Sequence, residues 1–230
     1  MISNCIAFIS QNFKFFYIWA FIIFSFSKMN DSLTDPIQLL WQSFLKGDDR
    51  SFAAIYQHFG QSLLSYGCKF NVEREMVKDA LQEIFTDLYL KRDHLHVNID
   101  NLKGYLFTAL KNNLLKKILK KKKTGFDAIE TAKPELRFEI EYSFQEQLIQ
   151  MEISKETTKK LHQAIEALSS KQKEIIFLKF EEELDYREIA GILNITVESA
   201  RKQLYRALKS LRELLDPKTI QLFLHLFSKK

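Results

Sequence analysis

The most informative segment of the chain is LDYREIAGILNITVESARKQLYRALKSLRELL, residues 184–215. Apolar residues recur at helical spacing in two runs, and Asp185 and Thr196 precede the runs as N-cap residues. Asn194 lies between the runs, and asparagine tolerates the left-handed backbone of a tight turn better than any residue except glycine. The pattern therefore predicts two helices joined by a tight turn.

The second predicted helix has a cationic face opposite its apolar side. Between Ser199 and Arg212 the sequence holds five cations and no acid. A solvated face on an ordinary helical hairpin is the simpler alternative. A helix that reads DNA in the major groove is nevertheless favoured, because the N-cap, the turn, the apolar period and the acid-free stretch are all consistent with it. The residues predicted to contact DNA are Ser199, Arg201, Lys202, Gln203, Arg206 and Lys209.

An upstream segment, DALQEIF at residues 79–85, predicts a helix with a polar strip beside a buried apolar face. Asp79, Gln82 and Glu83 form the strip. Carboxylates and an amide beside an apolar face suit the docking of a basic partner helix. On charge alone, a solvated amphipathic face is the better interpretation.

The segment NLKGYLFTALKNNLLKKILKKKK, residues 101–123, contains eight lysines and no acid. Its apolar residues, Tyr105 among them, predict a helix with a stripe that faces a core. Lysines can neutralise phosphates and asparagines can hydrogen-bond bases, as the holding of an opened DNA strand requires. A lysine run is also a common solvated patch, so its length alone is weak evidence. The candidate residues are Lys103, Tyr105, Lys111, Asn112, Lys116, Lys117 and Lys120.

In this order and separation, the three segments resemble bacterial RNA polymerase sigma factors of the sigma-70 superfamily, in the extracytoplasmic-function (ECF) subfamily. The resemblance covers roughly residues 36–125 and 156–216. It implies that the partners are core RNA polymerase, promoter DNA and an anti-sigma factor, with no small-molecule substrate. It also implies that Asp79, Gln82 and Glu83 meet the clamp of the largest polymerase subunit. The segment 101–123 would open the minus ten element, and the C-terminal helix would read the minus thirty-five element.

Some positions of the predicted melting helix differ from the family pattern. In the resemblance, Tyr105 occupies the site of the usual tryptophan and Asn112 that of the usual asparagine. Lys116, Lys117 and Lys120 stand where the family has arginines and an aspartate. Lysine presents a point charge rather than a bidentate fork, so the resemblance implies phosphate contacts here and no particular base contact.

Composition predicts an all-α protein of two small helical domains, since 230 residues include only three Pro and six Gly. We expect a four-helix polymerase-binding and promoter-melting domain at 29–123, a linker at 124–155, a helix-turn-helix domain at 156–217 and an apolar tail at 218–230 that packs against the rest. Residues 124–156 hold eight acids and three bases, and the resemblance implies that this linker enters a basic channel of the polymerase. In the free protein, linker or domain contacts are expected to cover the basic faces and weaken promoter binding.

Residues 1–28 form a separate apolar extension. As a helix, residues 6–26 would reach about 31 Å, enough to cross a bilayer. Lys14 inside the run disfavours insertion, and the absence of a basic start and of a small-residue cleavage site argues against a signal peptide. We favour Met29 as the true start, with a membrane anchor as the alternative.

Enzymatic interpretations find no support in the sequence. It has no glycine-rich phosphate loop, and its five histidines and two cysteines show no metal-binding spacing. We therefore expect no enzyme, cofactor or metal site, and a cytoplasmic protein unless residues 6–26 insert in a membrane. The sequence leaves two other functions open, a membrane-anchored helical interaction protein and a helix-turn-helix regulator that acts without polymerase.

Overall fold

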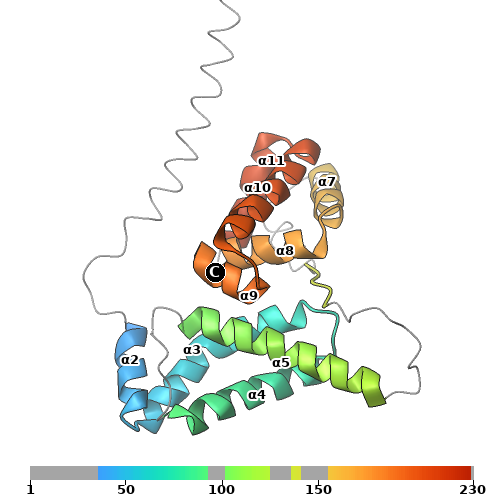
Figure 1. The fold of residues 1–230 in the computed structure, drawn as a ribbon. Coiled ribbons are helices and arrows are strands. Elements are labelled where there is room, and N and C mark those ends of the chain that lie inside the picture. Colours follow the sequence, from blue (N-terminus) through green and yellow to red (C-terminus); the bar gives the residue numbers. More distant parts are fainter. Residues whose placement is uncertain (1–35, 93–101, 125–135, 141–154, 229–230) are drawn as a thin grey trace, which may run out of the picture. The chain divides into compact units, whose positions relative to one another are not determined.

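The computed structural model describes residues 36–92, 102–124, 136–140 and 155–228 (Figure 1). Within these ranges the regular structure is helical, apart from one isolated antiparallel bridge between Phe70 and Phe138, so the all-α prediction is confirmed. None of the described helices is long and apolar enough to cross a membrane. The predictions for the extension at 1–28, and for most of the linker at 124–155, lie outside the described residues.

The N-terminal module contains α2 (Pro36–Leu45), α3 (Asp49–Cys68), α4 (Arg74–Leu90) and α5 (Leu102–Thr124), in agreement with the four predicted helices. Helices α2 and α3 are joined by a turn in which Gly47 has φ +99°. There the Asp48 side chain accepts hydrogen bonds from the backbone N–H groups of Arg50 and Ser51. Helices α3, α4 and α5 pack against one another, as Figure 1 shows. Their fully buried residues include Ile55, Leu63, Tyr66, Val77, Leu88, Leu106, Phe107, Leu110 and Leu114.

Tyr105 was expected in the core stripe of α5, and this expectation is wrong. Its side chain is 36% exposed, whereas Leu106 and Phe107 are fully buried. Successive side chains of a helix point about 100° apart. When Leu106 and Phe107 both face the core, the preceding residue, Tyr105, faces away from it. The helix therefore presents Tyr105 to solvent.

The C-terminal module contains α7 (Lys155–Glu166), α8 (Ser170–Ile176), η3 (Phe177–Glu181), α9 (Tyr186–Leu193), α10 (Val197–Leu214) and α11 (Pro217–Ser228). Ser169 is the N-cap of α8, in a capping box with Gln172. Helix α8 continues directly into the π-helical turn η3. The apolar tail forms α11, and Phe223 of this helix is fully buried.

The predicted turn between α9 and α10 is present. Asp185 caps α9 in a capping box with Glu188, and Thr196 accepts a hydrogen bond from the backbone N–H of Ser199 at the start of α10. Between the helices, Asn194 has φ 52° and ψ 51°, which is the left-handed conformation. These local features fix the angle at which α10 leaves α9.

Asn194 provides a test of this turn. Asn194→Ala should lower the free energy of unfolding by about 1 kcal/mol. Alanine is strained at positive φ and lacks the side-chain amide that can hydrogen-bond locally in asparagine. Asn194→Gly should keep or raise stability, since glycine adopts this conformation without strain. Urea unfolding of the two variants checks the order. Equal stabilities would show that the backbone strain at residue 194 is unimportant.

Candidate nucleic-acid interface

Helix α10 buries one face and exposes a cationic one. Ala200, Leu204, Ala207 and Leu211 are buried, where α10 packs against α7, α8 and α9. The predicted DNA contacts lie on the remaining surface of the helix. Arg201, Lys202, Arg206 and Lys209 are exposed, whereas Ser199 and Gln203 are half-buried at the edges of that surface.

Several of these side chains already have partners. Lys202 pairs with Glu198 at 2.6 Å, and Lys209 pairs with Glu213 at 4.0 Å, both one helical turn apart. Exposed pairs of this kind contribute only about 0–1 kcal/mol, so a phosphate can displace the carboxylates. The Arg201 guanidinium lies 5.4 Å from the centre of the Tyr186 ring in α9. Arg201 therefore helps to join the two helices as well as adding charge.

Tyr205 was not among the predicted contacts, yet it lies on the same exposed surface. Its side chain is 62% exposed, although it belongs to the most cationic part of α10. The signal in the sequence is its spacing, four residues after Arg201 and four before Lys209 and off the apolar stripe. An aromatic ring in this place can make apolar contact with a thymine methyl group.

The cations of α5 point in three directions. Asn112, Lys116 and Lys120 are exposed, and their four-residue spacing puts them on one side of the helix. Lys103 and Lys111 face the C-terminal module, where they pair with Glu182 at 3.1 Å and Glu174 at 2.8 Å. The residues of α5 that were predicted to contact opened DNA therefore do not form a single surface.

The third side of α5 faces α4. Lys117 pairs with Glu83 at 2.6 Å, and Lys121 pairs with Glu73 at 2.8 Å. Asn113 also donates a hydrogen bond to Glu83, at 2.9 Å. These contacts fix the register of α5 against α4 and occupy Lys117, which was predicted to bind nucleic acid.

The predicted polymerase-binding residues on α4 come together in one pocket. Asp79, Gln82 and Glu83 are exposed and line a cavity of about 520 Å³. Asp87 adds a third carboxylate to this acidic pocket, which suits a basic side chain of a partner. The other lining residues are Thr86 and Asn113.

An apolar groove shares Gln82 and Thr86 with the acidic pocket. Its volume is about 840 Å³, and Phe52, Tyr56 and Phe85 are among its lining residues. Tyr56 is 47% exposed, so its ring forms part of the open wall of this groove. The acidic pocket and the groove together fit a partner helix that carries both basic and apolar residues. Among the described residues, no group of three or more His, Cys, Asp or Glu is arranged to hold a metal ion.

The pairing between α4 and α5 can be tested by titration. The hydrogen bond from Lys117, followed by that from Asn113, lowers the pKa of Glu83, and the hydrogen bond from Lys121 lowers the pKa of Glu73. A lowered pKa stabilises the fold above the ordinary glutamate value of about 4.3, and this contribution is lost as the pH falls through the lowered pKa.

Lys117→Met should therefore raise the pKa of Glu83 and leave that of Glu73 unchanged, as followed by NMR titration of the carboxyl groups. Lys121→Met is the matched control, because it should have the reverse effect. A pKa of Glu83 that stays the same in Lys117→Met contradicts the pairing.

The chain is similar in sequence to known proteins. Residues 158–211, which include both helices of the turn motif, match the family model described as "Sigma-70, region 4". The chain is 28% identical over 174 residues to the ECF RNA polymerase sigma factor SigW of Bacillus subtilis (strain 168), which covers 74% of this chain and 91% of SigW. A chain in the solved structure of CnrH in complex with the cytosolic domain of CnrY is also similar, with a TM-score of 0.49 and 19% sequence identity. The similarity covers 77% of the present chain and 96% of the chain in that structure. The family match and the similarity to SigW support the assignment of the chain to the sigma factors of the sigma-70 superfamily, in the extracytoplasmic-function class, and a sigma factor's role in transcription initiation.

Proposed function

We propose that the protein binds core RNA polymerase, directs it to promoters and opens the promoter DNA. The observation that supports this most directly is the separation of surfaces. Helix α4 presents an acidic pocket for a protein partner, while α10 and one side of α5 present cations to solvent. No enzymatic activity is proposed, because sigma factors are not a class of enzymes.

The recognition helix α10 is proposed to read the minus thirty-five element. Lys202 and Gln203, in the N-terminal half, would contact bases, with Tyr205 beside them, because this end of a recognition helix enters the groove. Arg206 and Lys209, one turn later, would hold phosphates. Ser199 lies in the first turn of α10, where its backbone N–H donates a hydrogen bond to the side chain of the N-cap residue Thr196.

The exposed side of α5 is proposed to hold the opened strand at the minus ten element. Asn112, Lys116 and Lys120 supply hydrogen bonds and charge on one surface. Tyr105 is exposed on the same helix, and an exposed ring can stack on an unpaired base. The solvent exposure of Tyr105 thus supports a role in binding that a core position would have excluded.

The acidic pocket of α4 is proposed to dock on the clamp of the largest polymerase subunit. Three carboxylates around one cavity complement a basic side chain, and the adjoining apolar groove can hold the apolar face of the same partner helix. An anti-sigma partner remains a prediction from the family resemblance.

The role of α10 can be tested by two substitutions with different expected effects. Gln203→Ala should relax discrimination at one base position by about 1–3 kcal/mol, whereas Arg206→Ala should weaken binding to all sequences and reduce the salt slope by about one. Binding of the polymerase complex to a promoter series at several salt concentrations measures both quantities. Wild-type selection and salt dependence in both variants would rule out this assignment.

The polymerase contact can be tested by charge reversal in the acidic pocket. Asp79→Lys combined with Gln82→Lys should abolish binding to core polymerase in a pull-down, while far-UV circular dichroism stays unchanged, because both residues are exposed and exposed substitutions usually change stability by at most about 0.5 kcal/mol. Glu156→Lys combined with Gln163→Lys is the matched control, since it makes the same charge change at exposed positions of α7. Undiminished binding by the double variant would contradict the proposal.

The complete function is tested by transcription in vitro, in which full-length protein and core polymerase act on a library of DNA fragments from the source genome. Transcripts with defined starts that require both components support the proposal. A protein that binds specific DNA without polymerase, and starts no transcript with it, would instead be a conventional helix-turn-helix regulator.

A further inference from the structure

The ring of Tyr186, in the first turn of α9, contacts a cation of the recognition helix α10. The guanidinium carbon of Arg201 lies over this ring, 5.4 Å from its centre. The ammonium nitrogen of Lys179, in η3, lies over the same ring at 5.1 Å. Because the electron-rich face of an aromatic ring attracts cations, Tyr186 connects α10 and η3 to the start of α9.

The position of the Tyr186 ring is restrained by the residues around it. Asp185, directly before it, caps α9 in a capping box. Lys179 also donates a hydrogen bond to the carbonyl of Leu184, at 3.0 Å. Both Tyr186 and Lys179 are half-buried. A half-buried ring beside a capped helix start has little freedom to change rotamer, so it offers Arg201 a fixed surface.

Arg201 differs from two other cations of α10 in the kind of partner that it has. Lys202 and Lys209 pair with carboxylates, which a DNA phosphate would have to displace. Arg201 is exposed, and among the described residues no carboxylate pairs with it. A guanidinium that lies over a ring keeps the N–H donors in its own plane available for a phosphate. The contact with Tyr186 therefore orders this charge without neutralising it.

The side of α10 that carries Arg201 suits a contact with the DNA backbone. Arg201 directly precedes Lys202 and Gln203, the proposed base contacts, and points about 100° around the helix from Lys202. Its contact with Tyr186 places it next to the first helix of the turn motif. In such motifs the first helix crosses the DNA backbone while the second enters the groove. A phosphate at the edge of the groove is therefore the group that Arg201 can reach.

We propose that Tyr186 is a positioning residue, whose ring holds the Arg201 guanidinium ready to bind a DNA phosphate at the edge of the minus thirty-five element. The proposal rests on the proposed function, to which it adds a residue that acts through Arg201. A long side chain loses rotamer freedom when it binds, and the ring removes part of this loss before DNA arrives. Because a phosphate contact carries no sequence information, the effect should be similar on all duplexes.

The order of the Arg201 side chain can be measured in the free, full-length protein. In NMR relaxation measurements, the order parameter of the Arg201 Nε–H group should fall in Tyr186→Leu, which lacks the ring. It should stay near the wild-type value in Tyr186→Phe, which keeps the ring. An order parameter that is the same in the wild type and in Tyr186→Leu would show that the ring does not hold Arg201, and the proposal would fail.

Binding of the full chain to a fluorescent DNA duplex of mixed sequence, at low salt, tests the consequence for DNA. Tyr186→Leu should weaken binding by about two- to tenfold, the range expected when one long side chain must be ordered on binding. Its salt slope should match the wild type, since Arg201 still neutralises a phosphate. Arg201→Met should instead reduce the salt slope by about one. Tyr186→Phe should bind as the wild type does, because the ring rather than the hydroxyl holds Arg201.

A double-mutant cycle separates positioning from a purely structural role. If Tyr186 acts through Arg201, Tyr186→Leu should cause no further weakening in a chain that already carries Arg201→Met. Equal weakening with and without Arg201 would mean that the ring only stabilises the module, and the proposal would be wrong. A protein that binds no duplex at low salt, or an unchanged salt slope in Arg201→Met, would likewise exclude the phosphate contact.

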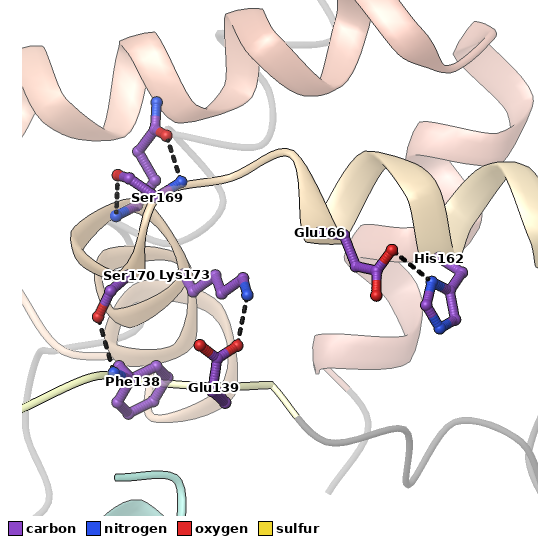
Figure 2. Close-up of polar contacts among 8 residues, drawn as sticks. Phe138, Glu139, His162, Glu166, Ser169, Ser170 and Lys173 are labelled. Atoms are coloured by element: carbon purple, nitrogen blue, oxygen red, sulfur yellow. Dashed lines mark hydrogen bonds and ion pairs between the residues drawn. The ribbon is translucent and has the colours of Figure 1, made fainter. Parts of the chain in front are cut away.

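Ser169→Ala is the control for stability. It removes the N-cap contacts of α8, which Figure 2 shows, and so destabilises the same module at a residue outside α9 and α10. Its duplex affinity should match the wild type, and a loss equal to that of Tyr186→Leu would overturn the proposal. Binding to core polymerase is measured separately. Its absence would contradict the proposed function alone, because neither the relaxation nor the duplex experiment uses polymerase.

Discussion

The buried carboxylate of Glu174 is the interaction on which the arrangement of the described modules depends. Between α8 and α5, its Oε1 atom accepts hydrogen bonds from both the Tyr66 hydroxyl and Lys111. Burial and the neighbouring carboxylate of Glu174 in turn raise the pKa of Tyr66 well above its ordinary value, so this hydroxyl keeps its proton and remains a donor. The loss of Lys111 would leave this buried carboxylate without its ion-pair partner, which is strongly destabilising, so the contact favours this arrangement of the two modules.

Helix α5 is the element through which the functions are coupled. One side meets α4 through Lys117 and Lys121, a second meets the C-terminal module through Lys103 and Lys111, and a third is open to solvent. A lysine-rich helix that looks uniform in sequence is therefore divided by its neighbours into two structural sides and one exposed side that is proposed to bind DNA. Since Glu83 lies in the acidic pocket and bonds to α5, a partner docked on α4 can also affect the helix that is proposed to hold DNA.

The features that sequence predicted correctly depend on neighbours close in the chain. The caps at Asp185 and Thr196, and the left-handed Asn194, are set by hydrogen bonds and sterics within a few residues. The partners of Lys103 and Lys111 lie 79 and 63 residues away, beyond the reach of any local pattern. The burial of Tyr105 was predicted wrongly for a related reason. Helical periodicity indicates an apolar stripe, but it does not indicate which edge of that stripe the neighbouring helices cover. The residues proposed to contact DNA and polymerase remain predictions.

The fully buried ring of Tyr66, from α3, contacts Phe70, Phe107 of α5, Phe138 of the linker and Phe177 of η3, with ring centres 4.9–5.9 Å apart. This aromatic cluster has a thermal consequence. Separation of the modules would expose apolar ring surface to water, and such exposure raises the heat capacity. Apolar association weakens on cooling, so the strength of this junction would change with temperature independently of any partner. A cluster of five rings at the junction would thereby make the packing of the two modules on each other sensitive to the temperature of the cell.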